Sequence, residues 1–67
     1  MDMYKLKYFM GKNGDTQSDL ASVLGIAQSA LSARMNGHTD FRKNEIDEIR
    51  KRYSLSAEEV QDIFFAS

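Results

Sequence analysis

The segment at residues 17–36 restricts the fold of this chain more than any other part of the sequence. Its apolar residues recur at helical spacing, and Gly25 divides it into two short pieces. Two helices that cross steeply through a tight turn need a small residue where they touch, which Ala21 supplies. Ile26 and Leu31 are apolar and can fill the angle between the helices, while glycine permits an unusual backbone conformation at the turn. The segment therefore predicts two short helices joined by a tight turn.

The rest of the chain also predicts helices, because the sustained period-two alternation that indicates strands does not occur. Helix starts are marked by the N-cap residues Asp2 and Thr16 and by a capping box that begins at Ser56. Helix ends are marked by Gly11 and Gly37. The predicted helices cover residues 3–10, 17–24, 28–35 and 43–53 and a last segment from residue 56 onward. We expect an all-α, compact five-helix bundle that forms a single domain, residues 1–67.

Apolar residues at helical spacing are the candidates for the core. They are Leu6, Phe9, Met10, Leu20, Val23, Leu24, Leu31, Met35, Ile46, Ile49, Tyr53, Val60, Ile63 and the anchor Phe41. A chain of this length buries only about 60% of the surface that its unfolded form exposes. We therefore expect a small core with little room for an enclosed substrate cavity. Phe64 and Phe65 are adjacent and cannot both face such a core, so the pair is a candidate dimer or partner contact.

The composition excludes several kinds of site. The chain has no cysteine, and its single histidine, His38, has no metal ligands at suitable spacing. No serine has an identifiable base, and no glycine-rich phosphate loop occurs. We expect no enzyme activity, no cofactor and no metal site. No apolar stretch approaches the roughly 18 residues of a membrane span, and the charged N-terminus is unlike a secretion signal. A cytoplasmic chain, complete from Met1, is expected.

The charges are unevenly distributed along the chain. Residues 1–43 carry six Lys or Arg and four acidic residues, a balance of +2, whereas residues 44–67 carry three basic and six acidic residues, a balance of −3. The net charge is −1. A surface that binds DNA needs local positive potential rather than a positive total. The balance therefore permits DNA binding and predicts modest nonspecific affinity.

Residues 17–36 and their flanks resemble the helix-turn-helix of lambdoid phage repressors and Cro proteins. The residues that carry the resemblance are Thr16, Gln17, Ala21, Gly25, Ile26, Gln28, Ser29, Leu31, Asn36 and Gly37. The tail is similar to that of small Cro-like regulators of phages and prophages of Gram-positive bacteria. It matches through Phe41, Glu45, Ile46, the run from Tyr53 to Val60, and Phe64-Phe65. The resemblance covers about residues 4–65 and implies binding to a double-stranded DNA operator.

The resemblance also implies which residues contact DNA. The family's Gln-Ser at the start of the recognition helix matches Gln28-Ser29, and Gln can bind both N7 and N6 of adenine. The expected base contacts are Gln28, Ser29, Ser32 and Ala33, the last against a thymine methyl group. Gln17 matches a family phosphate contact at a helix N-terminus, where free N–H groups and the helix dipole favour an anion. The expected phosphate contacts are Gln17, Arg34, Asn36, His38 and Lys43.

Some of these residues have a second interpretation. Arg34 departs from the broader family, in which this position commonly holds an aliphatic residue. In one interpretation the arginine reaches a DNA phosphate or a guanine edge. In the other, its aliphatic stem packs at the edge of the helix and its guanidinium pairs with an acidic side chain. His38 is alternatively a plain loop residue, and Lys43 part of a solvated face. The basic run at residues 50–52 is interpreted as surface, paired with Asp47 and Glu48 one turn away.

The function that the resemblance implies is that of a transcriptional regulator, a Cro-like repressor that occupies an operator in a phage or prophage switch. It would act in the cytoplasm or nucleoid of the bacterial host, with a homodimer through the C-terminal helix as a further expectation. An alternative of another class stays open: a protein-binding module that antagonises a partner repressor. The acidic C-terminal half and a surface phenylalanine would serve that role.

Overall fold

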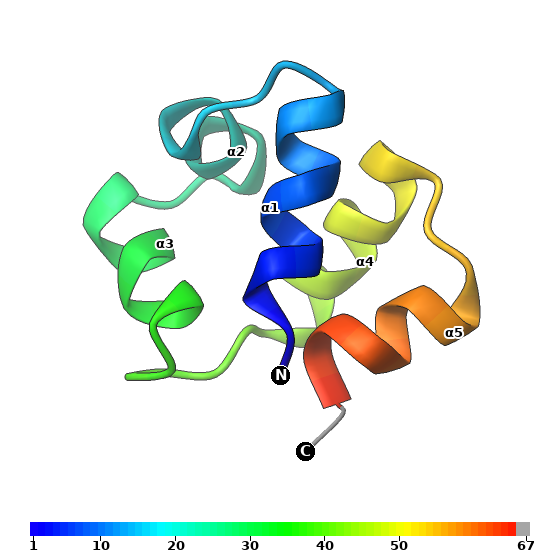
Figure 1. The fold of residues 1–67 in the computed structure, drawn as a ribbon. Coiled ribbons are helices and arrows are strands. Elements are labelled where there is room, and N and C mark those ends of the chain that lie inside the picture. Colours follow the sequence, from blue (N-terminus) through cyan, green and yellow to red (C-terminus); the bar gives the residue numbers. More distant parts are fainter. Residues whose placement is uncertain (66–67) are drawn as a thin grey trace.

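The computed structural model describes residues 1–65, which are helical and contain no strand. The elements are α1 (Met3–Lys12), α2 (Gln17–Leu24), α3 (Gln28–Met35), α4 (Lys43–Tyr53), α5 (Ala57–Val60) and a final π-helical turn, η1 (Gln61–Phe65). α1 runs through the middle of the molecule, with α2 and α3 on one side of it and α4 and α5 on the other (Figure 1). The predicted all-α, five-helix fold is confirmed.

The predicted bounds of α2, α3 and α4 are confirmed, but the predicted end of α1 at Gly11 is wrong. The helix runs one residue beyond Gly11, and Asn13 ends it by donating its side-chain N–H to the Phe9 carbonyl over 2.8 Å. The residue that turns the chain away is Gly14, with a left-handed φ of 72°. A polar cap and a left-handed residue together terminate a helix, and α1 meets both only at residues 13–14.

The predicted N-caps are confirmed. Thr16 and Asp19 bond each other reciprocally: the Asp19 N–H donates to the Thr16 hydroxyl over 3.2 Å, and the Thr16 N–H donates to the Asp19 carboxylate over 2.9 Å. Ser56 and Glu59 form the same arrangement at the start of α5, over 3.1 and 2.8 Å. Asp2 accepts the amide N–H at the third position of α1 over 3.1 Å. Because these bonds satisfy amides without an intrahelical acceptor, they fix where the helices begin.

One continuous apolar core joins all the elements. Its buried residues are Leu6, Met10, Leu20, Ala21, Leu31, Met35, Ile49, Tyr53, Leu55 and Ile63. The predicted inward position of Val23 is wrong, since its side chain is 39% exposed. Leu20, Ala21 and Leu24 share the side of α2 that packs against the core and α3. Helical spacing places Val23 outside this side.

The turn between α2 and α3 has the geometry that its sequence predicts. Gly25 adopts a left-handed φ of 68°, and the following amide, of Ile26, donates to the Ala21 carbonyl over 3.0 Å. The Ala21 side chain is 3% exposed, because α3 crosses directly over it. Leu31 is fully buried on the facing side of α3. The small residue at position 21 thus permits the close contact between the two helices.

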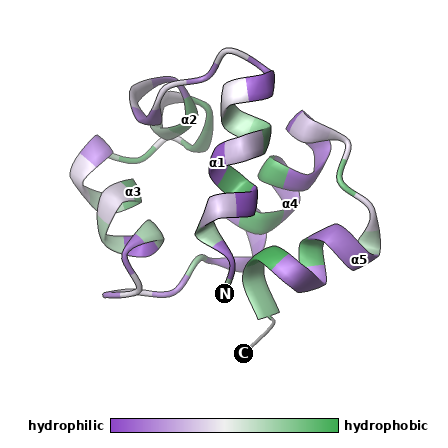
Figure 2. Ribbon diagram, viewed as in Figure 1, coloured by the Kyte–Doolittle hydropathy of each residue, from purple (hydrophilic) through white to green (hydrophobic). Residues whose placement is uncertain are grey.

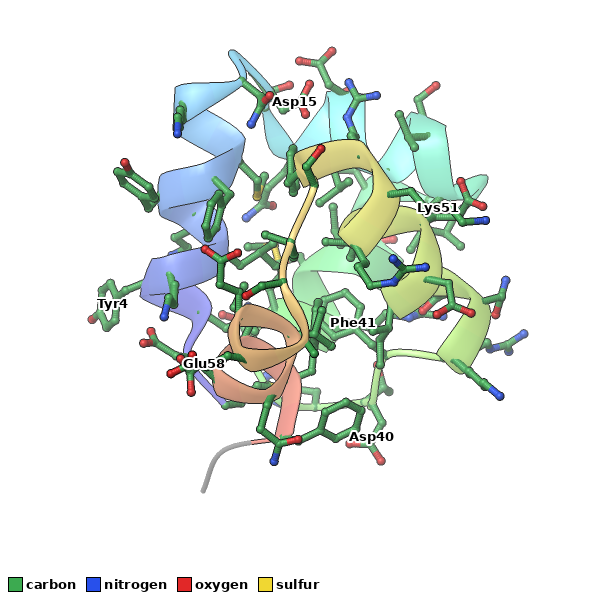
Figure 3. The ribbon with its side chains drawn as sticks, turned by 90° about the vertical axis from the view of Figure 1, so that its right-hand side faces the viewer. Tyr4, Asp15, Asp40, Phe41, Lys51 and Glu58 are labelled. Carbon is green, nitrogen blue, oxygen red and sulfur yellow. The ribbon has the colours of Figure 1, made fainter. Side chains whose placement is uncertain are left out.

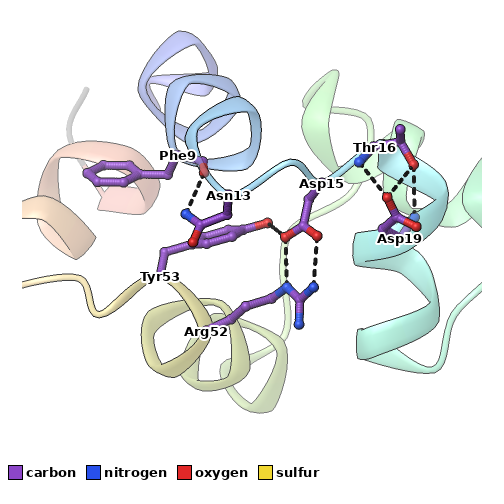
Figure 4. Close-up of polar contacts among 7 residues, drawn as sticks. All are labelled: Phe9, Asn13, Asp15, Thr16, Asp19, Arg52 and Tyr53. Atoms are coloured by element: carbon purple, nitrogen blue, oxygen red, sulfur yellow. Dashed lines mark hydrogen bonds and ion pairs between the residues drawn. The ribbon is translucent and has the colours of Figure 1, made fainter.

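A polar cluster joins the loop before α2 to the end of α4 (Figure 4). The Arg52 guanidinium donates two hydrogen bonds, each of 2.7 Å, to the two carboxylate oxygens of Asp15. The Tyr53 hydroxyl donates to the same carboxylate over 2.8 Å. Asp15 is 6% exposed at its side chain. The hydrogen bonds from Arg52 are the main reason that the pKa of Asp15 is lowered from 3.8 to about 2.

The C-terminal turn closes the core beside the start of the chain. Ile63 is fully buried, and its carbonyl accepts the Asp2 N–H over 3.0 Å. The Phe64 ring meets Phe41 edge-on at 5.1 Å between centroids, whereas Phe65 is 60% exposed. The expectation that one of the two phenylalanines lies at the surface is confirmed. Figure 2 shows this final turn as one of the most hydrophobic parts of the ribbon.

The Asp15 cluster predicts a pH-dependent stability. The pKa of Asp15 is lower in the folded chain than its ordinary value of 3.8, so its contribution is complete above that value and is lost as pH falls toward about 2. Urea unfolding of wild type and Asp15→Asn should be measured across this range. The two free energies of unfolding should differ on the order of 1 kcal/mol at neutral pH and become equal in acid. Asp40→Asn, which removes an exposed carboxyl, is the control. A constant difference at all pH values would contradict the prediction.

Two glycines predict opposite responses to the same substitution. An added methyl group meets no atom within 4 Å at either Gly11 or Gly25, so only the backbone differs. Gly25→Ala should cost about 1–2 kcal/mol, because its left-handed φ is unfavourable for an L-residue. Gly11→Ala should stabilise the chain by about 0.5–1 kcal/mol, because the position is helical. Thermal or urea unfolding of both variants measures this, and shifts of the same sign would refute it.

Candidate nucleic-acid interface

The outer face of α3 is a polar, uncharged surface formed by four predicted site residues. Gln28 and Ser29 are exposed, and Ser32 and Ala33 are half-buried. Leu31 and Met35 bury the opposite side of the helix. By helical spacing, Ser29 and Ala33 point most directly away from the core, and Gln28 and Ser32 follow one edge of that face. α3 lies at the outer edge of the molecule, far from α5 (Figure 1).

The predicted phosphate contacts after α3 lie on the loop that leads to α4 and at the first residue of α4, Lys43. Gly37 has a φ of 80°, and the His38 N–H donates back to the Ala33 carbonyl over 2.9 Å, which turns the chain sharply at the end of α3. Asn36, His38 and Lys43 are all exposed. Asn36 donates from its side chain to the Ser32 hydroxyl over 3.3 Å, which joins a phosphate candidate to a base candidate.

Gln17 occupies the first position of α2 and is half-buried. The amides of a first helical turn lack intrahelical acceptors, so the N-terminus of α2 presents N–H groups and positive dipole to an anion. Two acids lie close by in sequence. Asp15 is neutralised by its pair with Arg52, while Asp19 is occupied in the cap with Thr16. Only the Asp15 charge is therefore balanced by a cation, while Asp19 keeps its negative charge in the first turn of α2.

Of the two interpretations of Arg34, the structure favours the ion pair. Its Nε donates to Oε1 of Glu45 over 2.7 Å, with 11% of the arginine side chain and 3% of the glutamate side chain exposed. A second donor, on Nη1, reaches the Ala30 carbonyl over 3.1 Å. Leu31 and Met35 stay buried beside it, so the arginine does not lift α3 from the core. The Arg34 guanidinium is thus occupied inside the protein.

Sequence reasoning missed the partners of the arginines. Glu45 was recognised only as a matching family position, although an acid at the third residue of a helix commonly caps it, and Glu45 does accept the Arg42 N–H over 2.9 Å. The basic run at residues 50–52 was expected to pair with Asp47 and Glu48, but Arg52 pairs with Asp15 instead. No local spacing signals that second pair, because its members are 37 residues apart.

The chemistry that this surface offers is hydrogen bonding and methyl contact. Amide and hydroxyl groups on α3 can donate to and accept from base edges. Among residues 1–65 no three His, Cys, Asp or Glu side chains are placed to hold a metal ion. Over the same residues, no helix has both the length and the apolar character needed to cross a membrane.

A helix-turn-helix family profile matches residues 6–60, from α1 to the end of α5. The chain belongs to this helix-turn-helix family. Comparison with curated proteins and with solved structures gave no match. The family assignment indicates a DNA-binding transcription regulator. Within the matched residues, α2 and α3 are the two short helices that cross through the tight turn at Gly25.

Proposed function

We propose that the chain is a sequence-specific repressor of the Cro kind, which occupies an operator in a phage or prophage switch in the bacterial cytoplasm. The observation that carries the proposal is the uncharged polar face of α3, where Gln28 and Ser29 are exposed and Ser32 and Ala33 half-buried, in a chain of the helix-turn-helix family. Occupancy of the operator would exclude polymerase from the promoter.

Base recognition is assigned to the four residues on the α3 face. Gln28, at the first position of α3, can offer its amide oxygen and N–H group together to adenine N6 and N7 in the major groove. Ser29 and Ser32 can donate to or accept from any base edge, and the Ala33 methyl group suits a thymine methyl. None of these contacts requires a charge, so the sequence preference does not depend on the net charge of −1.

Phosphate contacts are assigned to groups on both sides of α3. Gln17 with the N-terminus of α2 lies before the recognition helix, and Asn36, His38 and Lys43 follow it. Lys43 is exposed at the first position of α4, so its ammonium group and the N-terminal amides of α4 can act on the same anion. Phosphate contacts on two sides of a recognition helix set its register without carrying sequence information themselves.

Two substitutions separate these roles. Fluorescence anisotropy with fragments of the gene's own upstream region should find one fragment that wild type binds more tightly than random duplex. Gln28→Ala should weaken binding to that fragment by about 1–3 kcal/mol and leave random duplex unchanged. Lys43→Met should weaken both about equally and reduce the slope of log affinity against log salt by about 1. If the wild-type protein binds no fragment, even at low salt, the proposal that it is a DNA-binding repressor is wrong.

We also propose that the regulator dimerises through the groove around Phe65. Phe65 lines two hollows of about 360 and 490 Å³ together with Phe41 and Ile46. Lys43 lines only the second, so the dimer contact is assigned to the first. Figure 3 shows Phe41 directed into the space between α4 and α5, with Asp40 at the edge. A projecting ring beside a hollow is self-complementary: under a two-fold axis each Phe65 can fill the hollow of the other copy. Such a dimer would present two α3 helices about 34 Å apart, one turn of DNA.

The dimer proposal predicts a change of mass on substitution. Phe65→Ala should weaken self-association at least about tenfold, because buried aromatic side chains dominate interfaces of this kind. Sedimentation equilibrium over a concentration series measures the effect. Tyr8→Ala removes a 62% exposed aromatic from α1, outside the groove, and should change nothing. A wild-type chain that sediments as a monomer at all concentrations would contradict the dimer.

The groove around Phe65 also allows a test of the alternative function, that of a protein-binding module. In a module that antagonises a partner repressor, Phe65 and the acidic C-terminal half would bind protein, and α3 would be unnecessary. Replacement of Gln28 and Ser29 would then spare the function, while Phe64→Ala and Phe65→Ala would abolish it. Phe65 is the cleaner probe, because Phe64 also packs against Phe41.

A further inference from the structure

A buried ion pair connects the recognition helix to the helix that follows it. Oε1 of Glu45 accepts two hydrogen bonds, one of 2.7 Å from Nε of Arg34 and one of 2.9 Å from the backbone N–H of Arg42. Through this single oxygen atom, Arg34 is linked to the backbone of Arg42, the residue that precedes the first turn of α4. A second hydrogen bond from the guanidinium, to the Ala30 carbonyl, returns to α3 itself and holds the guanidinium plane in place.

This pair is the only side-chain hydrogen bond that joins α3 to another helix within residues 1–65. α3 packs closely on α2, whereas it has few close approaches to α4. Its other attachments are the apolar contacts of Leu31 and Met35 in the core. Apolar contact is non-directional, while a charge-assisted hydrogen bond fixes distance and angle. Arg34 and Glu45 therefore supply the one directional side-chain contact between α3 and α4 within residues 1–65, in addition to the packing of both helices on α2.

We infer that Arg34 and Glu45 are positioning residues for sequence discrimination, an inference that rests on the proposed DNA-binding function. α3 carries the base-facing side chains, and the loop and start of α4 carry His38 and Lys43, the candidates for phosphate contact. The pair sets the distance between these two groups. Base readout requires placement to within about 0.5 Å, whereas nonspecific attraction to phosphates tolerates small displacements. Loss of the pair should therefore reduce discrimination and leave nonspecific affinity intact.

A direct contact between Arg34 and phosphate is the competing role, and burial opposes it. The Glu45 side chain is 3% exposed, so withdrawal of the guanidinium would leave a carboxylate buried without its counter-charge. The two roles predict different behaviour in nonspecific binding. A phosphate contact contributes to every DNA sequence and to the salt dependence, while a positioning residue contributes only where the bases are read.

The test measures affinity for the tightest-binding upstream fragment and for random duplex, each over a salt series, and takes their ratio. Arg34→Met and Glu45→Gln should each lower this ratio about tenfold, with random-duplex affinity and salt slope unchanged. The double variant should lose little more than the worse single variant, because both changes remove one interaction. Lys5→Met is the matched control, since it breaks a more exposed ion pair with Asp62, at 2.9 Å and distant from α3 in sequence.

Circular dichroism at the assay temperature shows which variants are folded. If Arg34→Met does not fold, Glu45→Gln supplies the test, because it removes the charge and keeps the side-chain volume. A folded variant with an unchanged ratio would overturn the inference and leave the pair a role in stability alone. Weaker binding to random duplex and a shallower salt slope in Arg34→Met would overturn it in favour of direct phosphate contact. A wild type without discrimination would instead overturn the proposed function, and the inference with it.

Discussion

The close crossing of α2 and α3 at Ala21 is the contact on which the rest of the structure depends. Only a small side chain allows the helices to approach there, and only a left-handed residue such as Gly25 turns the chain steeply enough after α2. The crossing places Leu31 in the common core, and with one side of α3 buried, the side with Ser29 and Ala33 is left at the surface. The surface that we assign to DNA is thus a direct consequence of packing.

Local signals predicted most of the fold, and non-local contacts account for the errors. Caps and helical spacing gave the bounds of α2, α3 and α4, because both depend on residues within one turn. The end of α1 was misplaced because Gly11 and Gly14 carry the same local signal, and only the second follows a polar cap. Val23 was assigned inward because it is apolar and stands at helical spacing from Leu20, but the direction from which α3 packs on α2 leaves it exposed.

In the candidate site, too, local signals predicted some features and non-local contacts determined the others. The residues along α3 could be predicted, since one helix and its motif determine which of them share a face. The partners of charged residues could not. Glu45 lies 11 residues from Arg34, and Asp15 lies 37 residues from Arg52, so each pair exists only once the helices are assembled. The first pair withdraws Arg34 from the surface, whereas Arg52 stays 37% exposed at its side chain and only has its charge paired. What remains near α3 is mainly hydrogen-bonding chemistry, which favours discrimination between sequences over general attraction to DNA.

The buried pair also explains how this chain accommodates its departure from the family pattern. An arginine at position 34, where an aliphatic side chain is common, would be costly if its charge met only apolar neighbours. Glu45 removes that cost, and the Arg42 amide and the Ala30 carbonyl satisfy further hydrogen-bonding groups. Among residues 1–65, no buried side-chain nitrogen or oxygen is left without a partner. Arg34 and Glu45 therefore depend on each other, because replacing only one of them leaves the other as a buried charge without its partner. An aliphatic residue at position 34 of this chain would leave the Glu45 carboxylate buried without its counter-charge, so it would require a second change at position 45.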